Sequence, residues 1–327
     1  MELDVNILKK LAKEYNLGEI VETPYKTTGG FCHTVYKITT TKGEYLIKPV
    51  GANTKDGKNF WKGKDALEEK LIQNNIPGIY SLKFNNSRVQ VFNDELIYII
   101  PCFNGKPIRG DKATNKQTKQ MAKCSALVNN IDLREEGFNL EPISIDWQYY
   151  VDYAKDKNEY IYNTIKDNLN LLNELTEKGN AHIHKMTKHY ALSHCDMDYK
   201  NVLWNKKEFK LIDMDSLSYY NPYMLLFKNA LVWSGYEENN INYRRFKLFI
   251  KTYFKHSNLK EKTLNLEDYY YATMLGLKWL EVNMQRVLHL VDNWKEMCDI
   301  GLEQTKITIA QIQNYYKNKH KIISIKI

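Results

Sequence analysis

The hydrophobic pattern of the chain changes once, near residue 105, and this change constrains the fold more than any other feature. Before it, short apolar runs rich in β-branched and aromatic residues alternate with turn residues, which predicts strands. The predicted strands are 20–24, 34–40, 44–49, 88–91 and 96–100. Helical periodicity at 3–16 and 60–75 completes this part. We therefore predict a small, mainly antiparallel β lobe with one internal helix.

After residue 105 the pattern is mainly helical. The predicted helices are 112–130, 146–185, 222–235, 241–256, 266–290 and 292–316. The exception is a β-like region at 191–217, where two apolar runs flank a polar turn at 205–208 and predict a hairpin. The sequence thus predicts an α+β protein with two lobes, the first at 1–104 and a larger, mainly α lobe at 105–327.

Composition narrows the class of protein. The formal net charge is +8, which suits an anionic ligand, but the lysines are scattered along the chain, so we expect neither a nucleic-acid partner nor a membrane partner. Five cysteines without a CxxC spacing make a disulfide framework or a zinc site unexpected. No stretch approaches the ~20 apolar residues of a membrane span. We expect a soluble, cytoplasmic protein; the sequence does not predict its oligomeric state.

The β-like region at 191–217 holds the densest group of polar side chains. His194 and Asp196 are followed by Asn201, five residues after Asp196, and by Asp213, seventeen residues after it. Phosphoryl transfer from ATP accounts for this spacing, since it needs a carboxylate beside the acceptor hydroxyl and hard oxygen ligands for Mg²⁺. We predict Asp196 as the catalytic carboxylate, and Asn201 and Asp213 as the metal ligands.

Other polar residues in this region have two interpretations each. His194 lies in the candidate catalytic loop, where it is expected to hold the loop by bonding the backbone rather than to act as a base. Asp215 either reaches the metal and the phosphates or serves as a hydrogen-bonded turn residue. Asp198 and Lys200 are expected to face solvent, with contact between Lys200 and the γ-phosphate as the alternative.

These motifs carry a resemblance. The segment 192–216 resembles the signature of the aminoglycoside phosphotransferase and choline kinase superfamily, H-G-D-x-x-x-x-N followed by I-D-[FWL]-[DE], including its bacterial spore-coat branch. The resemblance implies a protein-kinase-like fold, ATP and Mg²⁺ as cofactors, and a small-molecule acceptor with a hydroxyl group. Two departures stand out: Cys195 replaces the usual glycine, and the Asp-Leu-Ala expected downstream is absent near Asn221.

The resemblance also assigns roles in the first lobe, as a nucleotide-binding lobe. The turn at Gly29 and Gly30 is expected to cover the phosphates, although a glycine pair in a hairpin is also an ordinary tight turn. Lys48, on the strand at 44–49, is expected to pair with the α- and β-phosphates; the alternative is an edge-strand lysine. The hinge at 99–103 is expected to bind adenine through the backbone of Ile100 and Cys102.

Several carboxylates are candidates for the helix partner of Lys48. The predicted helix at 60–75 offers Asp65, Glu68 and Glu69. Counting back from Pro77 favours Asp65, whereas the local spacing and the longer side chain favour Glu68. We prefer Glu68 as the carboxylate that pairs with Lys48.

Two functions follow from the resemblance. The first is a small-molecule kinase that moves the γ-phosphate of ATP to a hydroxyl of a sugar, amino alcohol or aminoglycoside-like acceptor. The alternative is a catalytically weak or inactive spore-coat-type relative that binds nucleotide or has a structural role. A protein kinase is disfavoured because Asp-Phe-Gly and Ala-Pro-Glu are absent. The aromatics at 269–271 form either a cage for a cationic acceptor or ordinary core packing.

Overall fold

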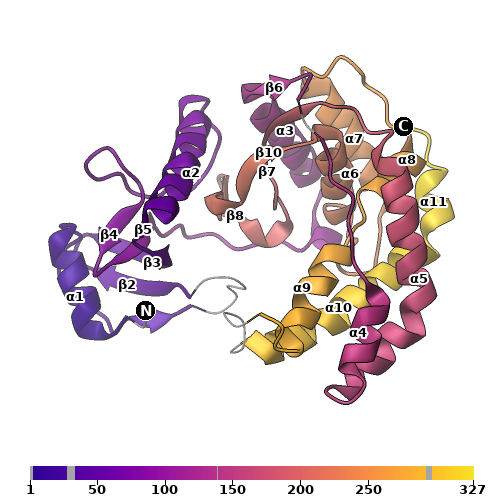
Figure 1. Ribbon diagram of the computed structural model, residues 1–327. Helices are drawn as coiled ribbons and strands as arrows, with labels where there is room; N and C mark the ends of the chain where they lie inside the picture. The colour runs from indigo at the N-terminus through magenta and orange to yellow at the C-terminus, as the bar shows by residue number, and fades with distance from the viewer. Residues whose placement is uncertain (1–2, 28–33, 138, 292–296) are drawn as a thin grey trace. The chain divides into compact units, whose positions relative to one another are not determined.

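The computed structural model describes residues 3–27, 34–137, 139–291 and 297–327 (Figure 1). Its internal contacts divide the chain into two compact units. The first consists of Met1–Ile108 and Leu192–Ser218, and the second of Arg109–Ala191 and Tyr219–Ile327. The segment that holds the candidate catalytic residues therefore packs with the N-terminal part of the chain.

A five-stranded antiparallel sheet in the order β1-β2-β3-β5-β4 forms the centre of the first unit. Its strands are β1 (Tyr25–Lys26), β2 (Tyr36–Thr40), β3 (Gly43–Ala52), β4 (Gln90–Phe92) and β5 (Glu95–Pro101). The predicted antiparallel lobe is confirmed, but the first predicted strand, 20–24, is wrong. Only Ile20 makes an isolated bridge, to Thr40. Pro24 has no N–H to donate, so the ladder cannot run continuously into β1.

Each face of this sheet is covered by one helix, because side chains alternate along a strand. Helix α1 (Val5–Glu14) places Leu8 and Leu11 in the same buried cluster as Ile97 and Ile99 of β5. Helix α2 (Lys55–Gln73) places Trp61 on the opposite face, against Leu96 and Tyr98. The predicted helix at 60–75 starts five residues too late, since Thr54 caps α2 by accepting from the Gly57 N–H.

The predicted hairpin is present as β8 (Val202–Trp204) and β9 (Phe209–Leu211). It is fastened to the first part of the chain on both sides. Leu211 exchanges backbone hydrogen bonds of 2.8 Å with Pro77 and Ile79, and Trp204 exchanges two of 2.9 Å with Lys106. These four backbone bonds explain why the segment 192–218 belongs to the first unit. Strands β10 (Leu217–Tyr220), β7 (Tyr190–His194) and β6 (Leu133–Arg134) form a three-stranded sheet in that order.

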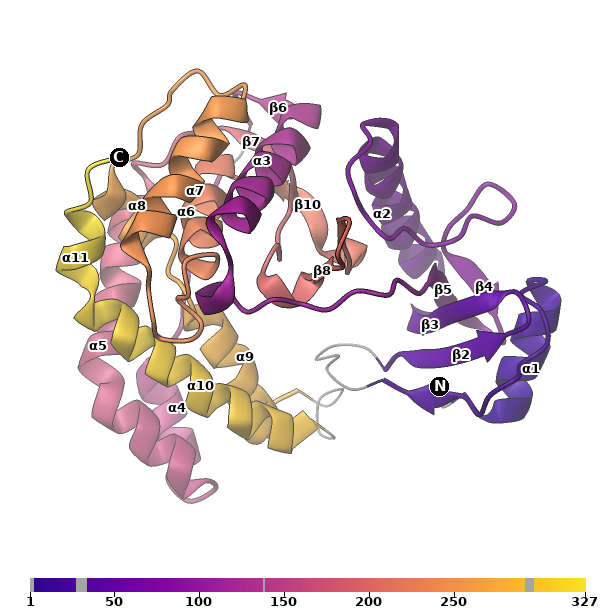
Figure 2. The same ribbon diagram turned by 180° about the vertical axis from the view of Figure 1, so that it is seen from behind.

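The second unit is mainly helical, as predicted (Figure 2). Its helices are α3 (Asn115–Ile131), α4 (Trp147–Ala154), α5 (Glu159–Ile183), α6 (Pro222–Val232), α7 (Tyr243–His256), α8 (Leu266–Ala272), α9 (Leu277–Val287), α10 (Cys298–Lys317) and α11 (Lys319–Ile323). Two predicted helices are each split in two. Asn158 caps α5 and separates it from α4, whereas Met274 and Gly276 adopt positive φ angles of 44° and 87° between α8 and α9.

The tyrosines at 269–271 belong to the core of the second unit. Tyr269, Tyr270 and Tyr271 are 6%, 1% and 5% exposed, and Tyr270 stacks on Tyr315 with 4.1 Å between ring centroids. Packing, not a cage, is therefore their role. Asn221, near which the resemblance implies an acidic residue, caps α6: its side chain accepts from two N–H groups at the start of the helix and donates to the Thr187 carbonyl.

None of the helices within the described ranges is both long and apolar enough to cross a membrane.

Candidate active site

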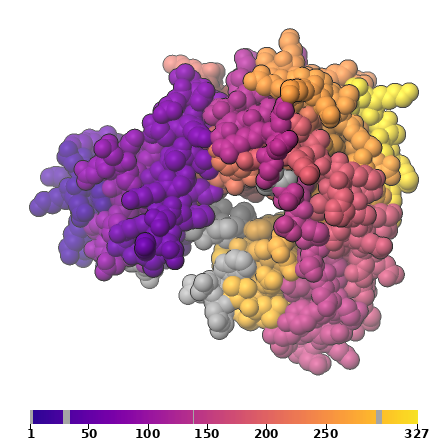
Figure 3. Space-filling model, turned by 45° about the horizontal axis from the view of Figure 1, so that its top comes forward, coloured from indigo at the N-terminus to yellow at the C-terminus, as the bar shows by residue number. Residues whose placement is uncertain are grey.

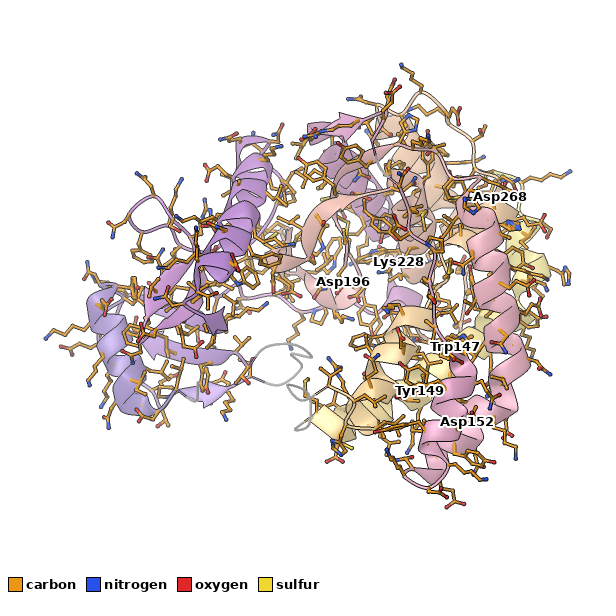
Figure 4. All side chains as sticks on the ribbon, viewed as in Figure 1. Trp147, Tyr149, Asp152, Asp196, Lys228 and Asp268 are labelled. Carbon is orange, nitrogen blue, oxygen red and sulfur yellow. The ribbon has the colours of Figure 1, made fainter. Side chains whose placement is uncertain are left out.

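Asp196 lies in the loop that follows β7 (Figure 4). The short 3₁₀ helix η2 (Tyr199–Asn201) turns the chain back, so that Asn201 Nδ2 donates to both Asp196 Oδ2, at 2.8 Å, and the Asp196 carbonyl, at 2.9 Å. The Asn201 amide nitrogen is thus committed to Asp196, which leaves the amide oxygen as its ligand atom. The five-residue spacing in the sequence brings these two side chains into direct contact.

His194 is buried and contacts the backbone of the following hairpin. Its Nε2 lies 2.8 Å from the Ile212 carbonyl oxygen, which can only accept, so Nε2 carries the proton. Ser216 Oγ lies 3.1 Å from the other ring nitrogen and 2.9 Å from the Asp213 carbonyl oxygen. This imidazole therefore connects the catalytic loop to the turn that carries Asp213.

Asp213 adopts a left-handed backbone conformation, with φ 63° and ψ 55°. This region is uncommon for residues other than glycine and is found at functional sites. The 3₁₀ helix η3 (Met214–Ser216) begins directly after it. Lys48 Nζ, on β3, lies 2.8 Å from Asp213 Oδ1 and 2.7 Å from Asp215 Oδ2. One turn thus presents two carboxylates to one buried ammonium group.

Lys48 and Asp215 stabilise each other's charge in this group. Burial by itself would lower the pKa of Lys48, but Asp215 and Asp213 outweigh it and raise that pKa. Burial would likewise raise the pKa of Asp215, but Lys48 lowers it to about 2. For Asp213, burial is the larger effect and its pKa is raised. At neutral pH the lysine is charged and Asp215 is ionised.

The donor set fits a magnesium ion bound together with phosphates. Asp213 offers a carboxylate and Asn201 an amide oxygen, both of which are hard ligands. Within the described ranges, no group of three or more His, Cys, Asp or Glu side chains could hold a metal ion. Mg²⁺ bound with a nucleotide does not need such a group, because phosphates and waters complete its octahedron.

The predicted pairing of Lys48 with an α2 carboxylate is not formed in this structure. Glu68 is 4% exposed and accepts a hydrogen bond from Ser81 Oγ at 3.1 Å, with Arg88 Nε 3.8 Å away. Asp65 accepts from Tyr98 Oη at 2.9 Å and from backbone N–H groups of the segment before β4. Glu69 pairs with Arg88 Nη2 at 3.0 Å. Arg88, to which no sequence pattern pointed, competes for these carboxylates.

The buried Glu68 predicts a pH dependence of stability. Burial raises its pKa to about 7, against the opposing effects of Arg88 and Ser81. The folded state therefore retains a proton that the unfolded chain releases above about pH 4.3, so this residue's contribution to stability is present at low pH and is lost as the pH rises to 7. The free energy of unfolding should fall by about 3 kcal/mol from this residue alone.

Glu68→Gln should remove that dependence, because glutamine cannot ionise. The free energy of unfolding of the variant and of the wild type is measured with urea at pH 5 and at pH 8. Relative to the wild type, the variant should be more stable at pH 8 than at pH 5 by about 3 kcal/mol. Glu69→Gln is the matched control and should show no such shift, since hydrogen bonding from Arg88 lowers the pKa of Glu69. An effect of Glu68→Gln that is equal at both pH values would contradict the assignment.

The hinge has a different free donor from the one predicted. The Cys102 N–H already donates to the Glu44 carbonyl at 3.0 Å, and Ile100 pairs with Leu46 inside the sheet. The Phe103 N–H is the first in the hinge without a hydrogen-bond partner in the described part of the chain. Gly29 and Gly30, predicted to cover the phosphates, lie outside the described residues.

Two charged residues of the site were missed or misplaced by the sequence analysis. Lys64 of α2 is half-buried and donates to the Leu217 carbonyl at 2.6 Å. Burial lowers its pKa, against the opposing effects of Cys195 and Asp215. Its helical spacing from Trp61 and Glu68 was the signal that it faces inward. Asp198, expected in solvent, is 3% exposed and caps η2 by accepting from the Lys200 N–H at 2.9 Å.

Several solved phosphotransferases share this fold. Spectinomycin phosphotransferase APH(9)-Ia, in complex with ADP and spectinomycin, is 18% identical with a TM-score of 0.70, over 98% of this chain and 99% of that chain. Amicoumacin kinase hAmiN, in complex with AMP-PNP, Ca²⁺ and Ami, is 12% identical with a TM-score of 0.59, over 91% and 92%. Ethanolamine kinase from Plasmodium vivax is 14% identical with a TM-score of 0.56, over 93% and 87%.

The chain matches no protein-family model and no curated protein. The likeness to the solved structures extends over nearly the whole chain. At identities of 12% to 18%, it shows the fold alone. The chain has the protein-kinase-like fold of the aminoglycoside phosphotransferases and of the choline and ethanolamine kinases.

Proposed function

We propose that this protein is an ATP- and magnesium-dependent phosphotransferase that acts on a hydroxyl group of a small molecule. The observation that carries the proposal is a pair of contacts within one compact unit: Asp196 with Asn201, and Lys48 with Asp213 and Asp215. A backbone hydrogen bond of 3.0 Å from the Ile212 N–H to the Asn201 carbonyl joins the two segments. Phosphoryl transfer needs positioned carboxylates, metal ligands and a cation more than it needs covalent chemistry. All three kinds of group are present, and their spacing matches the superfamily that the sequence resembles.

Asp196 is assigned as the carboxylate that orients the acceptor hydroxyl and takes its proton. Asn201 holds this carboxylate through Oδ2, which leaves Asp196 Oδ1 for the acceptor. Asp213 and Asn201 would hold Mg²⁺, and Asp215 is a further candidate ligand from the same turn. When bound, the ion would neutralise charge on the phosphates. His194 keeps the loop and the Asp213 turn in register through Ile212.

Lys48 and Lys64 supply the positive charge that a triphosphate requires. Lys48 is assigned to the α- and β-phosphates, which would replace Asp213 and Asp215 as its partners. Lys64 approaches the Asp215 turn from α2 and is a second candidate for phosphate contact. The Phe103 N–H, rather than that of Cys102, is the donor that we assign to the adenine edge.

The fold neighbours bear on the class of acceptor. Their structures include one with spectinomycin and ADP, one of an ethanolamine kinase and one of a choline kinase. Spectinomycin, ethanolamine and choline each carry a cationic nitrogen (an ammonium group) and a hydroxyl group. We therefore propose an amino alcohol, an amino sugar or an aminoglycoside-like compound as the acceptor of this protein, acting as a soluble, cytoplasmic enzyme.

Two experiments test this function. The first measures ATP binding by calorimetry in the presence and absence of Mg²⁺. The second uses mass spectrometry to detect phosphorylation in a panel of amino alcohols, sugars and aminoglycosides. Magnesium-dependent binding of ATP and phosphorylation of one acceptor class are expected. Absence of ATP binding at millimolar concentration would reject the proposal. Binding without transfer to any member of the panel would instead favour the second candidate.

That second candidate is a nucleotide-binding relative of low activity, such as a spore-coat-type protein. The observation that favours it is the arrangement around Lys48. Asp65, Glu68 and Glu69 are all engaged by other partners, so no α2 carboxylate orients the lysine. The retained cluster of Asp196, Asn201 and Asp213 supports the active kinase over this candidate.

A further inference from the structure

A basic groove lies between α3 and α7, which pack against each other in the second unit (Figures 1 and 2). Its volume is about 610 Å³. In Figure 3 the surfaces of the two helices, in magenta and orange, adjoin at the top of the view. Five exposed lysines line this groove: Lys116, Lys119, Lys123, Lys251 and Lys255.

Within the described part of the chain, the charge of these lysines is not balanced by carboxylates. Neither α3 nor α7 contains an aspartate or a glutamate. Among the residues that the structure describes, none of the five lysines has a carboxylate partner. Lys119 and Lys123, like Lys251 and Lys255, are four residues apart on one helix, an arrangement of like charges that destabilises a helix. Helix stability therefore does not explain this pattern, whereas an anionic ligand does.

The charge density indicates which anion fits. Lys116 and Lys123 are seven residues apart, or about 10 Å along the helix axis, so the groove presents roughly one positive charge per 2 Å. One strand of duplex nucleic acid carries one negative charge per about 3.4 Å, and the two strands together carry one per about 1.7 Å. An extended acidic peptide rises about 3.3 Å per residue, and only alternate side chains face one side, which gives about one charge per 6.6 Å. A phosphate chain therefore comes closer to the charge density of the groove than an acidic peptide does.

We propose that this groove binds a phosphate chain, either the sugar–phosphate backbone of a nucleic acid or inorganic polyphosphate. The remaining lining side chains are Gln120, Thr252 and His256, so among the described residues no Phe, Tyr or Trp ring lines the groove as a stacking platform of the kind found in single-strand binding proteins. Recognition is thus of the backbone charge and independent of base sequence. Lysine suits this role, since it binds phosphate as a point charge.

His256 provides a reporter inside the groove. It is half-buried beside Lys123 and Lys255; burial first, and then these two charges, lower its pKa. A phosphate chain bound to the two lysines would offset their charge and raise the pKa of His256. An NMR titration of its ring protons, with and without the anion, measures this directly.

Three probes separate the sources of the anion: a 20-base-pair DNA duplex, inorganic polyphosphate and polyglutamate. Binding is measured by fluorescence anisotropy from 50 to 200 mM salt. If all five lysines contact phosphates, a plot of the logarithm of the duplex association constant against the logarithm of the salt concentration should have a slope of about −4.5. Lys119→Glu/Lys251→Glu should weaken phosphate-chain binding at least tenfold, and Lys119→Arg/Lys251→Arg should keep it.

Lys9→Glu/Lys10→Glu is the matched control, because both residues are exposed on α1 and the net charge changes by the same amount. It should leave the affinity unchanged within about twofold, and circular dichroism checks that both variants fold. Equal weakening by both variants would overturn the proposal, since net charge alone would then explain binding. So would equal affinity for polyglutamate, or no binding of duplex and polyphosphate at 50 mM salt. The phosphate probe that binds more tightly at 200 mM salt identifies the source.

Discussion

Replacing Asp213 with asparagine should abolish magnesium-dependent phosphate transfer, with a fall in kcat/KM on the order of 10³-fold or more. The substitution removes the negative charge of a candidate metal ligand while preserving its size. The left-handed backbone at this position, φ 63°, is one that asparagine adopts readily, so the turn should remain intact. Lys48 also keeps Asp215 Oδ2 as a partner at 2.7 Å. The loss should therefore reflect chemistry and not unfolding.

The measurement is ADP release as a function of magnesium concentration, at saturating ATP and with the acceptor identified in the panel. Asp94→Asn is a matched control: Asp94 is exposed in a turn, also with a left-handed φ, of 59°, in the same unit. This control should retain wild-type activity. Full activity in Asp213→Asn, or an equal loss in both variants, would contradict the assignment of Asp213 as a metal ligand.

Replacing Asp196 with asparagine should separate binding from transfer. We expect the affinity for Mg-ATP to change by less than about threefold, because Asp196 is not assigned to the nucleotide. The rate of transfer should fall by about 10²–10⁴, the usual contribution of a positioned acid or base. Asn201 can still donate to the side-chain oxygen and to the main-chain carbonyl at position 196, so the loop should keep its shape.

Calorimetry of Mg-ATP binding and single-turnover transfer, performed on the same preparation, distinguish the two quantities. Weaker ATP binding with a normal transfer rate would assign Asp196 to the nucleotide and remove it from the acceptor side. Asp94→Asn again serves as the control for loss of a carboxylate elsewhere in the unit.

Much of the fold was predictable because it depends on contacts close in sequence. Alternation predicted β2, β3 and β5 within a few residues, and the polar turn at 205–208 predicted the β8–β9 hairpin. The contact between Asp196 and Asn201 follows from one short turn, and so from their spacing. Element ends were less predictable, since caps such as Thr54 act through a single hydrogen bond that the hydrophobic pattern does not record.

The choice of charge partners was not predictable, because it depends on which buried groups compete. Three carboxylates on α2 are candidates for Lys48 by spacing alone, yet Arg88, Ser81 and Tyr98 engage all three. Lys48 then pairs with Asp213 and Asp215, which are 165 and 167 residues away in sequence. No local pattern ranks such partners.

The basic groove shows the same division between sequence and structure. Along the chain its lysines are scattered, and the sequence predicted no basic patch. Each helix fixes the spacing within one row of lysines, because side chains three and four residues apart share a face. Only the packing of α3 against α7 places the two rows around one groove. The sequence by itself determined the elements and the catalytic spacing, because both arise from short-range geometry. Only the tertiary structure decided the partners of Lys48 and Glu68 and the position of the lysine rows, because these depend on long-range packing and on competition for burial.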